Sequence, residues 1–115
     1  MAHQLEDYSF GRVTVDGEVH TKDLIVHDGG VIPRWWREQG HSLVPSDLDT
    51  IIHNNLKTLI VGCGASGQLV VPLSTQEWLQ NRGVSVIALP TAEACRRYNE
   101  MCSRGGVVAA LHLTC

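Results

Sequence analysis

Apolar and polar residues alternate along the first third of the chain, which is the pattern of β-strands. The segment Ser9–Val15 alternates by twos and ends at Asp16-Gly17, a pair typical of a two-residue hairpin turn. Two further extended pieces are expected after it, separated by a glycine turn: Glu18–His27 and Val31–Trp36. Pro33 restricts the last piece to a sheet edge or a bulge. The first third of the chain is therefore predicted to form an antiparallel β-ribbon.

From Pro45 onward, segments with helical spacing alternate with short apolar runs. Three helices are predicted, each with a side chain that caps its N-terminus: Ser46, Ser74 and Thr91. The predicted strands between them are Lys57–Gly62, a short one at Gln68–Val71, Val84–Leu89 and Val107–Leu113. Strands separated by helices favour parallel pairing in a layered core. The pattern predicts an α/β fold, namely a small three-layer domain with an N-terminal antiparallel β-ribbon.

Length and charge limit the classes of protein. A chain of 115 residues is expected to form a single domain over residues 1–115. With 9 basic and 12 acidic residues and no basic run longer than two, it lacks the charge pattern of a nucleic-acid-binding protein. The longest apolar run, Val107–Leu111, is too short to cross a bilayer, and Met1–Phe10 does not resemble a signal peptide. We expect a soluble, cytoplasmic protein with no membrane or nucleic-acid partner, either a monomer or a weak homodimer.

The stretch Gly62–Gly67 has the spacing G-x-G-x-x-G and follows an apolar run. In dinucleotide-binding folds such glycines let the backbone approach a pyrophosphate at a helix N-terminus. Here the next residues, Gln68–Val71, lead into Pro72 and indicate a strand instead of a helix. The following strand runs into Pro90-Thr91 without the acidic residue that holds a ribose. We therefore expect no NAD, NADP or FAD binding, and no other cofactor.

The four cysteines show no metal-binding spacing. Cys95 and Cys102 share a predicted helix face but lie about 10 Å apart along its axis, too far for a disulfide. His112 and Cys115 are three residues apart, which a metal ion can use, but two more ligands would have to come from elsewhere. We expect free thiols in a reducing compartment and no metal ion.

Two strand ends are expected to meet at one edge of the sheet, where ligands of such folds usually bind. We call this edge the strand-end rim; it comprises Gly62, Cys63, Gly64, Ala65, Ser66 and Gly67 together with Thr91 and Glu93. The glycines either permit a tight turn with positive φ or leave room for a ligand. A small anion is favoured over a polyphosphate, because the negative charge of Glu93 opposes the positive helix N-terminus.

Other residues carry alternatives that the sequence leaves open. Cys63 is either a small buried thiol or a nucleophile with His112 as its base, and Ser66 lacks the strand-to-helix turn that exposes a nucleophilic serine. In an extended segment Trp35 and Trp36 point to opposite faces, so one fills the core and the other is left for solvent or a partner. Arg37 either forms a surface ion pair or binds an anion at the strand-end rim.

Several weak motifs, taken in order, resemble one protein family. They are Trp36-Arg37-Glu38 with Gly40-His41, then Val61–Gly67, Leu89–Ala94 with Tyr98-Asn99-Glu100, and His112-Leu113-Thr114-Cys115. The resemblance is to the MTH-nine-three-eight-like domain family, which includes the adipogenesis-associated domain protein and, more distantly, mitochondrial complex I assembly factor 3. It implies a three-layer fold with a central mixed sheet and no agreed enzyme activity. It also implies function through protein contacts, although the mitochondrial role is not expected to transfer directly.

Two functions follow as hypotheses. The first is a non-enzymatic protein-interaction or assembly module with an unknown protein partner, which binds through the strand-end rim, Trp36 and Arg37. The second is a pocket for a small anion or metabolite at the Gly62–Gly67/Thr91 rim, with thiol chemistry at Cys63. The first is preferred and no catalytic residue is assigned, because the sequence shows no acid–base pair with suitable spacing.

Overall fold

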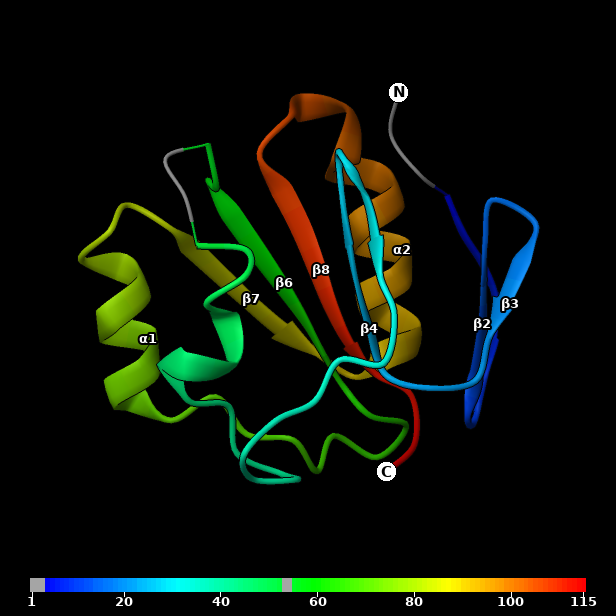
Figure 1. Cartoon of the computed structure of the whole chain (residues 1–115), viewed down its shortest axis with the longest axis horizontal. Helices are drawn as coiled ribbons and strands as arrows, with labels where there is room; N and C mark the ends of the chain where they lie inside the picture. The colour runs from blue at the N-terminus through cyan, green and yellow to red at the C-terminus, as the bar shows by residue number, and fades with distance from the viewer. Residues whose placement is uncertain (1–3, 53–54) are drawn as a thin grey trace.

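The computed structural model describes residues 4–52 and 55–115, and within them the chain forms two sheets (Figure 1). The smaller sheet contains β1 (Leu5–Ser9), β2 (Arg12–Val15) and β3 (Glu18–His20), in that order and all antiparallel. The larger sheet has the order β5-β4-β8-β6-β7 and is mixed. Its strands are β4 (Leu24–His27), β5 (Gly30–Ile32), β6 (Thr58–Cys63), β7 (Ser85–Leu89) and β8 (Val107–His112).

The predicted N-terminal ribbon is present, but all three of its strand predictions are wrong in their bounds. The predicted strand Val31–Trp36 corresponds to β5, which ends at Ile32 and lies in the larger sheet. The hairpin at Asp16-Gly17 is confirmed, with φ of 49° and 87° at the two turn residues. The predicted strand Ser9–Val15 is instead broken by a turn at Gly11, which pairs β1 with β2. The predicted strand Glu18–His27 splits into β3 and β4, which belong to different sheets. It breaks because Asp23 accepts hydrogen bonds from the His112 ring and the Leu113 N–H, which tie this point to the end of β8.

The larger sheet is central because both of its faces are buried. β6 runs parallel to β7 and β8, whereas β4 runs antiparallel to β8 and β5. Along β6, Leu59 and Val61 face one apolar cluster and Ile60 faces the other, as the two-residue period of a strand requires. This mixed sheet with layers on both sides agrees with the predicted α/β class.

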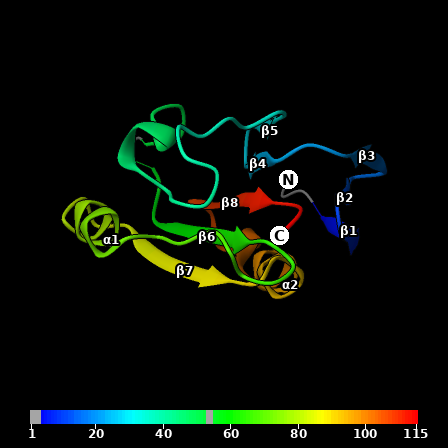
Figure 2. The same cartoon turned by 90° about the horizontal axis from the view of Figure 1, so that it is seen from below.

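Figure 2 shows what covers each face of this sheet. On one side α2 (Thr91–Met101) packs with the small sheet, and Tyr98 and Val13 are fully buried there. On the other side lie α1 (Leu73–Gln80) and the long connection between β5 and β6, which contributes Leu43 and Leu48. Among the described residues, α2 is the longest helix at 11 residues, and neither helix could reach across a membrane.

All three predicted helix caps are wrong. The expected helix at Pro45 is one 3-10 turn, η1 (Pro45–Leu48), and the Asp47 carboxylate rather than the Ser46 hydroxyl accepts the Val44 N–H. α1 begins at Leu73, ahead of Ser74, and α2 begins at Thr91 itself. In both helices a proline takes the cap position with extended backbone, and it has no side-chain acceptor to offer. The hydroxyl of Thr91 is thereby released for other contacts.

Candidate functional site

The carboxyl ends of β6 and β8 meet at the strand-end rim, with Cys63 paired to His112. Gly64 and Thr91 touch there: the Gly64 N–H donates to Thr91 Oγ1 over 2.8 Å, and the Thr91 N–H donates to the Gly64 carbonyl over 3.1 Å. The same Thr91 hydroxyl donates to the His112 carbonyl over 2.6 Å. One buried side chain thus fastens the glycine loop, the start of α2 and the end of β8 to one another.

The glycine loop holds another segment of its own chain. The Ala65 N–H donates to the Thr114 carbonyl over 2.6 Å, and the Gln68 N–H donates to the Cys115 carbonyl over 3.0 Å. A Cβ on Gly64, where φ is +99°, would lie 2.4 Å from the carbonyl carbon of Cys115. Glycine is needed here because residues 114–115 approach so closely. These N–H groups, together with that of Gly67, which donates to Gly64, are already used.

The remaining predicted residues of the rim differ in exposure. Cys63 is buried, and its thiol donates to the Val61 carbonyl over 3.7 Å. Burial raises the pKa of the Cys63 thiol, and a backbone hydrogen bond at Leu89 offsets this only partly, so the neutral thiol is favoured. Ser66 is exposed and donates to the Cys115 carbonyl over 3.3 Å. Glu93 is exposed in the first turn of α2, while Gly62 lies close against Thr91 and Leu111.

The structure decides which of the two adjacent tryptophans is exposed. Trp35 is buried, with 8% of its surface exposed, and its indole N–H donates to the Asp47 carbonyl over 3.0 Å. Trp36 is 76% exposed. The side chain of Arg37 turns back over the Trp35 ring, with its guanidinium carbon 4.7 Å from the ring centroid.

Arg37 belongs to a partly buried polar network that the sequence did not reveal. Its guanidinium donates to Asp23 Oδ2 over 2.9 Å and to the Gly40 carbonyl over 3.0 Å. The same Asp23 oxygen lies 2.8 Å from His112 Nδ1. Desolvation by burial acts to raise the pKa of Asp23, but the hydrogen bonds from His112, the Leu113 N–H and Arg37 outweigh it and hold that pKa below its ordinary value. Arg37 therefore pairs with an internal carboxylate, not with a surface group.

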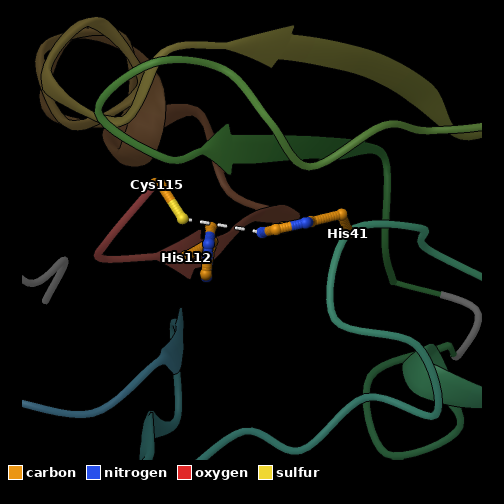
Figure 3. A group of neighbouring side chains, drawn as sticks. All are labelled: His41, His112 and Cys115. Carbon is orange, nitrogen blue, oxygen red and sulfur yellow. Dashed lines mark hydrogen bonds between the residues drawn. The ribbon is translucent and has the colours of Figure 1, made fainter.

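Beside this network, three side chains with metal-binding atoms lie together: His41, His112 and Cys115 (Figure 3). Their donor atoms all lie within 4.8 Å of one another, and Cys115 Sγ is 3.7 Å from His41 Nε2. In the sequence, His41 contributes only to the family resemblance. It is 74 residues from Cys115, and only the fold brings the two side chains together. The one local indication that His41 belongs to a site is its position immediately after Gly40 and close to Arg37, which is itself a predicted site residue.

Trp36 lines two hollows on the surface of the protein. One, of about 340 Å³, is also bordered by Arg34, Glu38 and Asp49. The other, of about 530 Å³, is also bordered by Thr21, Lys22 and Thr114.

The fold and site define a small α/β domain with a mixed central sheet, whose glycine-rich loop is hydrogen-bonded to residues 114–115 of its own chain. The chain belongs to the family described as "Protein of unknown function (DUF498/DUF598)", whose model matches residues 5–112. The crystal structure of the conserved hypothetical protein PH1505 from Pyrococcus horikoshii OT3 is similar at 27% identity and a TM-score of 0.86, over 97% of this chain and 99% of that one. MT938 is similar at 32% identity and a TM-score of 0.79, over 99% and 100% of the two chains.

A more distant neighbour connects these findings with the resemblance noted in the sequence. The solution structure of a Bordetella pertussis protein, described as a Mth938-like domain, matches at 19% identity and a TM-score of 0.66, over 96% of this chain and 85% of that one. At that identity the likeness concerns the fold alone. Together with MT938 and the family match, it confirms the MTH-nine-three-eight-like assignment.

Proposed function

We propose that this domain is a non-enzymatic protein-interaction or assembly module whose protein partner packs against Trp36. The exposure of Trp36, at 76%, is the observation that carries the proposal, since the adjacent tryptophan is buried. An indole held in water offers a large apolar area to a partner. Tryptophan is also among the residues most enriched at the energetic centres of protein interfaces.

The surroundings of Trp36 suit an interface. The indole borders both hollows, so an apolar partner side chain inserted into either would pack against it. Arg34 lines both hollows, Lys22 one of them, and Glu38 and Asp49 the other. This gives an apolar centre with charged residues of both signs around it, as in the polar rim of known interfaces.

The residues considered for catalysis support an enzyme less well than Trp36 supports an interaction module. The Cys63 thiol is buried and its pKa is raised, which disfavours the thiolate that nucleophilic chemistry needs. The anion-pocket alternative is weaker for a geometric reason: the N–H groups of Gly64, Ala65 and Gly67 already donate within the protein. We propose a cytoplasmic setting for the module, because cysteine thiols that are not joined in disulfides, such as those of Cys63, Cys95 and Cys115, persist in reducing compartments.

The test is site-specific photocrosslinking in cells. A benzophenone amino acid replaces Trp36 in one variant and Phe10 in the control, since Phe10 is 65% exposed but lies in the turn between β1 and β2. We expect a defined protein adduct from position 36 and none from position 10. In a separate capture experiment, the wild type and Phe10→Ala should retain the same protein, and Trp36→Ala should not. Equal adducts from both positions, or unchanged capture by Trp36→Ala, would overturn the proposal.

A further inference from the structure

The cluster of His41, His112 and Cys115 carries an inference that does not depend on the interaction proposal. Two imidazoles and a thiol converge from three places in the chain: the connection before η1, the end of β8 and the residue three positions beyond it. His112 is buried, whereas His41 and Cys115 reach the surface. Figure 3 shows the three side chains directed toward a common point, with the His112 ring lying edge-on to that of His41 at a centroid distance of 5.7 Å.

The orientation of His112 indicates a missing ligand. Its side chain is only 9% exposed, and its Nε2 is buried with no hydrogen-bond partner among residues 4–52 and 55–115. His112 Nδ1 lies 2.8 Å from Asp23 Oδ2 and 3.2 Å from Arg37 Nη2. An ionised carboxylate only accepts hydrogen bonds and makes the shorter of the two contacts, so we assign the proton of the neutral ring to Nδ1. In the neutral ring the Nε2 lone pair is then left without a donor. An unpaired buried nitrogen of this kind costs free energy, and a carboxylate behind a histidine is the usual support of a metal-binding imidazole.

The backbone of each donor residue is also fixed. The glycine loop holds the carbonyls of Thr114 and Cys115, as described above. The His41 carbonyl accepts the Val70 N–H over 2.9 Å. Fixed backbones and an oriented ring mean that only side-chain rotations are needed to complete a site.

We propose that His41, His112 and Cys115 bind one Zn²⁺ ion, with Asp23 as the carboxylate that orients His112. Two imidazole nitrogens and one thiolate are the donor set that Zn²⁺ accepts, and three protein ligands leave a fourth position open. In a tetrahedral zinc site the donor atoms lie about 3.5 Å apart, given metal–ligand distances of about 2.0–2.3 Å. The 3.7 Å between Cys115 Sγ and His41 Nε2 is close to that value, and the remaining pairs, which lie within 4.8 Å, need to approach by up to about 1.3 Å.

This proposal departs from the expectation of no metal ion. That expectation rested on the need for two further ligands besides His112 and Cys115. The fold supplies one of them, His41, and solvent can supply the other at the open position.

The experiment uses the reduced, tag-free full chain, stripped with a chelator and titrated with Zn²⁺ against a chromophoric competitor. We expect one equivalent of Zn²⁺ per chain, and with Co²⁺ a thiolate-to-metal charge-transfer band. His41→Ala and Cys115→Ser each remove a proposed ligand at the surface. Loss of a residue that only supports a ligand typically weakens metal binding by roughly tenfold to hundredfold, so each of these variants should weaken Zn²⁺ binding by more than that. His20→Ala, in the separate small sheet, is the matched control and should bind as the wild type does.

Circular dichroism of each metal-free variant separates loss of a ligand from loss of the fold. Asp23→Asn should weaken Zn²⁺ by roughly tenfold to hundredfold while the Co²⁺ charge-transfer band persists, because it removes the orienting carboxylate and no ligand. Less than one equivalent of Zn²⁺, a Co²⁺ spectrum without the thiolate band, or equal affinity in His41→Ala, Cys115→Ser and His20→Ala would each overturn the proposal.

Discussion

Replacing Thr91 by valine removes one hydroxyl and keeps the shape of the side chain. Thr91 is fully buried, and its Oγ1 joins the Gly64 N–H to the His112 carbonyl. The variant leaves both groups buried without these partners, at about 1–3 kcal/mol each, while an extra buried methyl returns about 1 kcal/mol. We therefore expect Thr91→Val to lower the free energy of unfolding by about 3 kcal/mol, or the melting temperature by about 12 °C at about 4 °C per kcal/mol.

Urea unfolding followed by circular dichroism measures this loss, and two other threonines calibrate it. Thr75 is also buried, but among the described residues its hydroxyl makes one bond, to the Leu43 carbonyl over 2.8 Å, so Thr75→Val should cost only about 1 kcal/mol. Thr50 is exposed, and Thr50→Val should change stability by less than about 0.5 kcal/mol. If Thr91→Val costs no more than Thr75→Val, the hydroxyl does not join two segments as described.

Three further outcomes are expected. In urea unfolding, Gly64→Ala should lower the free energy of unfolding by more than about 2 kcal/mol and Gly67→Ala by only about 1 kcal/mol. Both glycines have positive φ, but of the two only a Cβ on Gly64 would meet backbone atoms, those of residues 114–115. Equal losses in the two variants would contradict this. Calorimetry should detect no binding of NAD, NADP or FAD, and a dissociation constant in the low micromolar range would refute that expectation. Burial raises the pKa of the Cys95 thiol from 9.0 to about 12. The unfolded chain therefore loses this proton at a lower pH than the folded chain, and the free energy of unfolding should fall as pH rises from about 9 to 12. If Cys95→Ala shows the same dependence of stability on pH as the wild type, this expectation is wrong.

Short apolar runs predicted most of the central sheet. β6 and β8 are almost entirely buried, and burial on both faces of a strand demands consecutive apolar residues. β6, β7 and β8 each start or end within about one residue of their predicted bounds. The prediction failed where a tertiary contact overrides the pattern. Glu18–His27 is predicted as one strand, yet the bonds from His112 and Leu113 to Asp23 break it between two sheets. The helix caps failed because the prolines ahead of Ser74 and Thr91 already set an extended entry to each helix.

The candidate site was predictable only where it is local in sequence. The glycine loop and Thr91 were identified from strand ends, and the structure places them in contact. The sequence also indicated that one of Trp35 and Trp36 is exposed, but not which, since that depends on the acceptor at the Asp47 carbonyl. His112 and Cys115 are three residues apart, but the proximity of His41 to them joins two segments far apart in the chain, and no periodicity or spacing encodes it.

The position of residues 114–115 explains why a loop with dinucleotide-binding spacing serves a different purpose here. In a cofactor-binding fold, loop N–H groups at strand ends donate to phosphate oxygens. In this chain the Gly64 and Gly67 N–H groups donate to Thr91 and Gly64. The Ala65 N–H and, just after the loop, the Gln68 N–H donate to the carbonyls of Thr114 and Cys115. Any molecule that this end of the sheet binds must therefore approach from beyond that segment. There it meets the Cys115 thiol, and next to Thr114 it meets the hollow that Asp23 and Trp36 border. The glycine loop thus acts indirectly, by fixing a segment that contributes Cys115 to the proposed metal site and Thr114 to one of the two hollows beside Trp36.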